Sequence, residues 1–221
     1  TEARPDRDPT LALRAAAAAA QSGLPLAPIT VQRLAAESAP LPRPWPRSAR
    51  EPFVSLIGAG TATVGVWEAM DQAGIIASLL PGWDVVRSAP QRNAVHRFTV
   101  DRHLVETAVQ ASALTRSVDR PDLLLVAALL HDIGKARGGD HSVVGAELSA
   151  DLAPMMGFDE EETGIIVTLV RHHLLLVETA TRRDLDDPAT AAFVAERIGS
   201  VECLELLTTL TRADALATGP A

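Results

Sequence analysis

Apolar and polar positions alternate along this chain with the period of a helix. Runs in which apolar residues recur every three to four positions predict helices at 9–22, 30–37, 53–58, 62–73, 75–80, 101–115, 121–132, 142–156, 159–176, 188–198 and 201–217. No segment shows a convincing period of two, which is typical of a half-buried strand. Aromatic residues make up 3% of the chain, so leucine, valine, isoleucine and alanine must fill the core. We therefore expect an all-α fold.

Proline and glycine mark several of the predicted boundaries. Pro9 starts the first helix, Gly23 ends it, and Thr30 is expected to cap the second. Five prolines lie between positions 40 and 52, and no helix is expected to persist at that density. The segment 81–99 is expected to be a loop.

These boundaries predict the domain organisation. A helical lead-in occupies 1–39, a proline-rich connector 40–52, short helices that pack on the next domain 53–80, and a helical-bundle domain 81–219. The total of 221 residues suits one domain with an appendage. The chain does not begin with methionine, so we expect it to be a fragment of a longer protein.

Two ligand-capable residues follow the most apolar of the predicted helices. Residues 121–130 are apolar nearly all round, which indicates a central buried helix, and His131 and Asp132 come directly after it. Burying them without partners costs several kcal/mol, roughly 2–7 for a neutral polar group, and a divalent cation removes that cost. Gly134 lets the chain turn away, and Lys135, the sole lysine, can approach an anionic substrate. The alternative is an ordinary helix end at which the histidine and lysine face the helix dipole.

Histidines cluster in one part of the chain. All six lie between positions 96 and 173, and they are His96, His103, His131, His141, His172 and His173. Neutral imidazole suits Mn, Fe, Co and Zn. Any single histidine could be an ordinary surface or capping residue, but the cluster favours a metal site.

Composition excludes several other classes of function. The formal net charge is −8, so a broad basic face for nucleic acid is not expected. We expect no membrane span, because no apolar run reaches the required length, and the first residues lack a secretory signal. Cys203 is the sole cysteine, so no intrachain disulfide can form and a cytoplasmic location is expected.

The order of the ligand-capable residues resembles a known family. His103, then His131 and Asp132, then Asp214 match the H…HD…D pattern of the HD phosphohydrolase superfamily, whose domain is a helical bundle. More narrowly, residues 81–219 resemble the HD domain of the bacterial GlnD family, enzymes that attach a nucleotide to the signal protein PII and remove it. The matching stretches are His96–His103, His131–His141, His173–Leu176, Thr181–Pro188 and Ala213–Thr218.

The resemblance implies roles for individual residues. A first divalent ion is bound by His103, His131, Asp132 and Asp214, and a second by His141 and His173 with Asp132 as the bridge. His172 is a weaker candidate ligand, because adjacent helical residues point about 100° apart, and His96 is expected to have a loop or supporting role. Asp132 and Lys135 are the expected catalytic residues, with Lys135 steadying the phosphoryl oxygens. Manganese or magnesium is favoured, whereas iron, cobalt and zinc also suit the ligands.

The resemblance also implies the reaction, which is hydrolysis of nucleotidylated PII to release UMP or AMP. The transferase half-reaction is not expected here, since Gly199 and Ser200 are not followed by paired aspartates. No pattern of a small-molecule sensor domain is present either. Two alternatives stay open: an HD phosphohydrolase acting on free nucleotides or cyclic dinucleotides, and a non-catalytic regulatory domain that keeps a structural metal. The oligomeric state is not predicted.

Overall fold

The computed structural model describes residues 3–91 and 98–218. Within these ranges the chain is all-helical and forms no strand, as predicted. The elements are α1 (Leu11–Gln21), α2 (Pro28–Glu37), α3 (Arg47–Ile57), α4 (Ala62–Gln72), α5 (Ile75–Leu79), α6 (Trp83–Val86), α7 (Val100–Ser112), the 3-10 helix η1 (Thr115–Ser117), α8 (Pro121–Leu130), α9 (His141–Met155), α10 (Glu160–Arg171), α11 (Leu175–Arg182), α12 (Pro188–Ile198) and α13 (Val201–Thr218).

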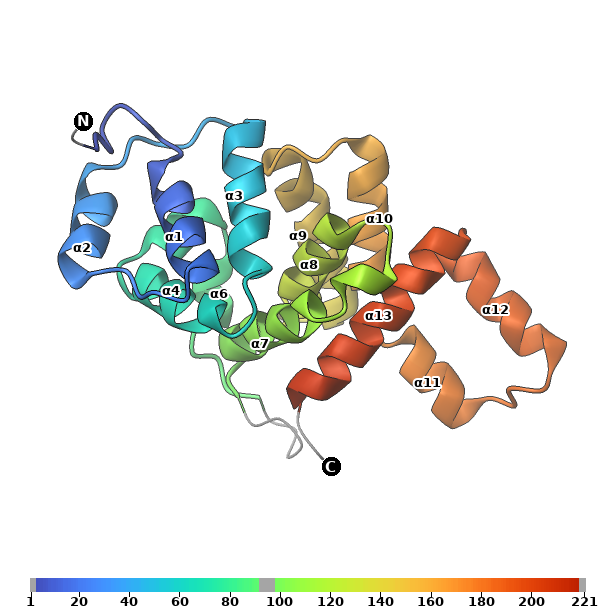
Figure 1. The fold of residues 1–221 in the computed structure, drawn as a ribbon. Coiled ribbons are helices and arrows are strands. Elements are labelled where there is room, and N and C mark those ends of the chain that lie inside the picture. Colours follow the sequence, from blue (N-terminus) through green and yellow to red (C-terminus); the bar gives the residue numbers. More distant parts are fainter. Residues whose placement is uncertain (1–2, 92–97, 219–221) are drawn as a thin grey trace.

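Helix α8 forms the centre of the molecule, as its sequence predicts. Every residue from Leu123 to Leu130 is buried. Helices α7, α10 and α13 pack around α8, α9 packs on α10, and α3 covers α8 from the N-terminal side. The hairpin of α11 and α12 projects away from this body (Figure 1). The C-terminal end of α8, where His131 follows, is therefore fixed by surrounding helices.

The N-terminal helices contact the rest of the molecule through α3, α4, α6 and the segment just before α3. The amide of Trp45 donates to the Met155 carbonyl at 2.8 Å, and the Arg50 guanidinium forms an ion pair with Glu162 at 3.3 Å. The aromatic rings on this side form a continuous row: Trp45, Phe53, Trp67 and Trp83. Such edge-to-face contacts add to the stabilisation from apolar burial.

Helix formation within the proline-rich segment was not expected. Helix α3 begins at Arg47, inside the predicted connector, and continues through Pro52. Proline removes one backbone hydrogen bond at this position, but burial of Phe53, Leu56 and Ile57 offsets that loss. Tertiary packing therefore overrides the local signal.

Two other predicted boundaries were also wrong. The second helix begins at Pro28 rather than near Thr30, because proline suits the first position of a helix. The predicted loop at 81–99 contains the single-turn helix α6, whose Trp83 and Val86 are buried. His96 lies outside the described residues.

The helix predicted at 159–176 is two helices, α10 and α11, separated by a turn at 172–174. Taken together with the turn between them, the two helices form a stretch, Glu160–Arg182, that is long and apolar enough to cross a membrane by length and composition alone. This finding differs from the expectation that no apolar run reaches the length of a membrane span. Core helices of soluble proteins pass the same test, and 33% of the most apolar part of this stretch is buried. The break has a local consequence, since it places His173 in a turn beside the end of α8.

Candidate metal centre

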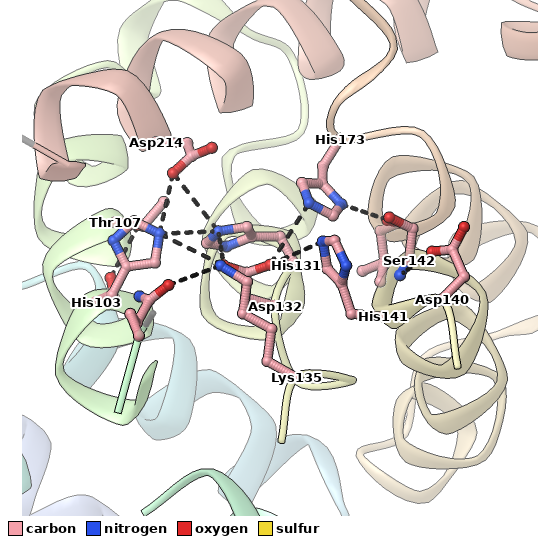
Figure 2. Close-up of polar contacts among 12 residues, drawn as sticks. His103, Thr107, His131, Asp132, Lys135, Asp140, His141, Ser142, His173 and Asp214 are labelled. Atoms are coloured by element: carbon pink, nitrogen blue, oxygen red, sulfur yellow. Dashed lines mark hydrogen bonds and ion pairs between the residues drawn. The ribbon is translucent and has the colours of Figure 1, made fainter. Parts of the chain in front are cut away.

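Four side chains, from α7, α13 and the turn that follows α8, converge at the C-terminal end of α8 (Figure 2). His103 lies in the first turn of α7, His131 and Asp132 directly follow α8, and Asp214 lies on α13. His103 and His131 are about 1% exposed or less, and Asp132 is 2% exposed. Residues separated by more than a hundred positions therefore meet in the interior, as the resemblance implies.

The first set of ligand-capable atoms is compact. His103 Nε2 lies 3.2 Å from His131 Nε2 and 3.0 Å from Asp214 Oδ1. Asp132 Oδ2 lies 3.7 Å from His103 Nε2 and 3.5 Å from His131 Nε2. These nitrogens and oxygens are the ligand atoms that divalent transition metals prefer.

The second set uses the other oxygen of the same carboxylate. Asp132 Oδ1 lies 3.5 Å from both His141 Nε2 and His173 Nε2. This oxygen is buried and has no hydrogen-bond partner among the described residues, although buried polar atoms are normally satisfied. A cation between Asp132, His141 and His173 would satisfy it. The two oxygens of Asp132 thus face different sets of ligand-capable atoms.

Backbone carbonyls orient two of the imidazoles. His131 Nδ1 lies 2.8 Å from the Ala128 carbonyl oxygen, and His173 Nδ1 lies 2.8 Å from that of Val170. An N–H on each Nδ1 donates to the carbonyl and turns Nε2 toward the centre. Histidine ligands in metalloproteins usually have such a partner, so these contacts also fit a metal site.

The charges of the cluster are strongly coupled. Burial lowers the pKa of His131, but the carboxylates of Asp132 and Asp214 outweigh it and raise that pKa to about 9. Burial also opposes ionisation of Asp132, yet the charges of His131 and Lys135 hold its pKa well below the usual range. Burial and the charge of His131 lower the pKa of His173 to about 4. These shifts favour ionised carboxylates, and a cation bound at His131 Nε2 would have to displace a proton from it.

A close backbone approach fixes the two sets relative to each other. A Cβ added at Gly134 would lie 2.1 Å from the His141 carbonyl oxygen and 2.5 Å from the amide nitrogen of Gly145. The loop after Asp132 can touch the first turn of α9 only because position 134 has no side chain. Ala136, two residues further on, has a φ of 60°, a region that is costly for alanine.

An open cavity of about 800 Å³ adjoins both sets and is lined in part by Asp132, Lys135, His141, His173 and Asp214. This volume suits a small organic ligand. Lys135 Nζ lies 2.5 Å from Asp132 Oδ2 and donates to Gln91 Oε1 at 2.8 Å. No pattern in the sequence points to Gln91, because this residue lies in a segment predicted to be a loop.

His172 is not brought to either set. It is half-buried and lines a different cavity, beside Arg171 and Arg197. Burial and the charges of these two arginines lower its pKa. The turn at 172–174 directs the neighbouring His173 inward instead.

Known proteins resemble this chain in sequence. Residues 100–219 match the HD domain family. Over 99% of its length the chain is 64% identical to a bifunctional uridylyltransferase/uridylyl-removing enzyme of Streptomyces coelicolor, of which it covers 26%. It is 50% identical over 99% of its length to the enzyme of that name from Mycobacterium tuberculosis, covering 27% of it. It is 39% identical over 98% of its length to the enzyme of that name from Corynebacterium glutamicum, covering 32% of it. The chain thus spans about a quarter to a third of the length of these curated relatives. It belongs to the HD domain family.

Proposed function

We propose that this chain is a metal-dependent phosphodiester hydrolase that removes UMP, or AMP, from nucleotidylated PII. The observation that carries the proposal is the position of Asp132, whose two oxygens face two sets of ligand atoms beside an open cavity. The names of the relatives, which include uridylyl removal, support the choice of reaction and substrate.

The proposed reaction breaks the bond between phosphorus and the tyrosine oxygen of PII. Water supplies a hydroxyl group to the phosphorus, and the tyrosine oxygen leaves and takes up a proton. Bound divalent ions lower the pKa of a coordinated water and neutralise phosphoryl charge. We propose that His103, His131, Asp132 and Asp214 hold the first ion, and that Asp132, His141 and His173 hold the second.

Lys135 is the residue we propose for binding the phosphoryl group. Its contacts with Asp132 and Gln91 tether the ammonium at the wall of the cavity, next to the ligand atoms. A fixed positive charge at that place stabilises the negative charge that develops on the non-bridging oxygens. The tether also means that this stabilisation needs little reorganisation of the side chain.

The proposal is tested with the purified chain, Mn²⁺ and PII carrying either UMP or AMP. We expect release of the free nucleotide, and the modification that is released faster identifies the natural base. An Asp132→Asn variant serves as the control for contaminating hydrolases. If the folded, metal-loaded chain releases neither nucleotide, the proposal is wrong.

A panel of free nucleotides and cyclic dinucleotides tests the related hypothesis, in which the same centre acts on small substrates.

The cavity beside the ligand atoms favours catalysis over a purely structural ion, because structural metal sites are usually closed. A structural ion would raise the melting temperature without supporting turnover on any of these substrates.

A further inference from the structure

A second cavity, of about 440 Å³, lies beside the open cavity of about 800 Å³ that adjoins the ligand atoms. His141 and Leu174 line both cavities and form the wall between them. The second cavity is also lined by Arg171 at the end of α10 and by Phe193 and Arg197 on α12. In Figure 2 its lining residues Asp140 and Ser142 lie beyond His141, on the side away from His103.

The guanidinium of Arg197 is held in place at this cavity. Its Cζ lies 3.5 Å from the centre of the Phe193 ring, and its Nη1 donates to the Phe193 carbonyl oxygen at 2.9 Å. Arg183 stacks on the same ring at 3.7 Å. Stacking and a backbone hydrogen bond restrict an arginine that is otherwise exposed, so less entropy is lost when it binds an anion. Phe193 therefore positions both guanidiniums, because each of them stacks on its ring.

Arg171 supplies a second positive charge. It is exposed and forms no ion pair with any residue that the structure describes. The acidic residues of this cavity have other partners: Asp140 accepts from the Ser142 amide at 2.8 Å, and Glu178 pairs with Arg182 at 3.6 Å. Among the described residues, Arg197 forms one ion pair, a distant one of 3.7 Å with the exposed carboxylate of Glu196. The two arginines are therefore available to a ligand.

The charge of the proposed substrate decides what this ligand is. A nucleotide joined to a protein through a phosphodiester has one negative charge, on the scissile group, since its ribose and base are neutral. That group binds at the ligand atoms, and the adjoining cavity of about 800 Å³ can hold the nucleoside. An additional anion must then come from the protein on the other side of the scissile bond.

We propose that Arg171 and Arg197 form a subsite for an acidic side chain of the protein substrate, close to its modified residue. This inference rests on the proposed function. The subsite contributes to recognition of the carrier protein and does not take part in bond cleavage. Arginine suits this role because its planar fork can bind a carboxylate through two parallel hydrogen bonds.

The test compares two substrates, nucleotidylated PII and the small diester bis(p-nitrophenyl) phosphate, with Mn²⁺ present. We expect the double variant Arg171→Gln/Arg197→Gln to raise KM for the protein about tenfold, since two partly exposed charge pairs are lost, with kcat nearly unchanged. Hydrolysis of the small diester should not change. Arg116→Gln, which removes an exposed charge from η1, is the matched control and should match the wild type on both substrates.

Further variants separate recognition from folding. Arg171→Gln alone should give an intermediate KM. Because this variant leaves the stacking on Phe193 intact, it can replace the double variant if that one fails to fold. Higher ionic strength should reduce the difference between wild type and variants, because screening weakens exposed charge pairs. An unchanged KM, or equal losses on both substrates, would overturn the subsite. If the wild type cleaves the small diester but not nucleotidylated PII, the proposed function itself fails.

Discussion

The two sets of ligand atoms are built in different ways. His103 and His131 of the first set are almost completely buried and are held by helices that pack around α8. In the second set His173 is also buried, but the side chain of His141 is 31% exposed, and this residue begins α9 directly after a loop. A site formed by core helices keeps its shape, whereas one that depends on a loop changes with the loop. We therefore expect the first ion to bind more tightly than the second.

The largest effect is expected at the residue that both sets share. Asp132→Asn should lose both ions and lower kcat by about 10³-fold or more, because metal assistance contributes several kcal/mol and each 1.36 kcal/mol is tenfold in rate. Metal content and turnover measure this, with circular dichroism as the control for folding. A folded variant that keeps one ion and normal turnover would contradict the bridging role.

Single-set variants sharpen the comparison. His103→Ala should abolish binding of the tighter ion, whereas His141→Ala should reduce the bound metal from two ions to one and leave the tighter affinity unchanged. His172→Gln is the matched control, since His172 touches neither set, and it should bind two ions as the wild type does. Calorimetric titration with Mn²⁺ gives both affinities. Equal losses from His103→Ala and His141→Ala would remove the distinction between the sets.

The loop that joins the sets can be altered without touching a ligand. Gly134→Ala places a Cβ 2.1 Å from the His141 carbonyl oxygen, so α9 must shift and His141 must move away from Asp132. We expect weaker binding of the second ion and a smaller effect on the first. Gly138→Ala is the control, because a Cβ there meets nothing within 4 Å. If both variants bind metal equally, the close approach at Gly134 does not position the second set.

Metal affinity should depend on pH through the first set. The pKa of His131 is raised to about 9, so below that pH a proton competes with the cation for the imidazole. Affinity for Mn²⁺ should therefore rise with pH, by up to about tenfold per unit between about pH 6 and about pH 8. Titrations in buffers of different ionisation enthalpy should show proton release on binding. An affinity that is flat over this range would contradict the coupling of His131 to Asp132 and Asp214.

The sequence predicted much of this centre because its signals are local. An apolar helix that ends in His131 and Asp132 is visible in the sequence, and the structure confirms that this helix is buried. The resemblance supplied His103 and Asp214, which no local pattern connects, and they do lie beside His131. Their roles as ligands stay a prediction until an ion is observed.

Other features depend on tertiary contacts that the sequence does not reveal. Helix α3 passes through Pro52 because its apolar face is buried. The break after α10 directs His173 inward and leaves His172 outside the centre, although nothing in the apolar pattern distinguishes the two. The contact of Lys135 with Gln91 joins positions 44 residues apart, and no helical period can predict it.

Anomalous diffraction from crystals grown with Mn²⁺ tests the central claim most directly. We predict two peaks on either side of the Asp132 carboxylate, one close to His103, His131 and Asp214, and one close to His141 and His173. A single peak near the first three residues would leave the second ion without support. No peak within coordination distance of Asp132, in crystals that contain manganese, would contradict the whole account.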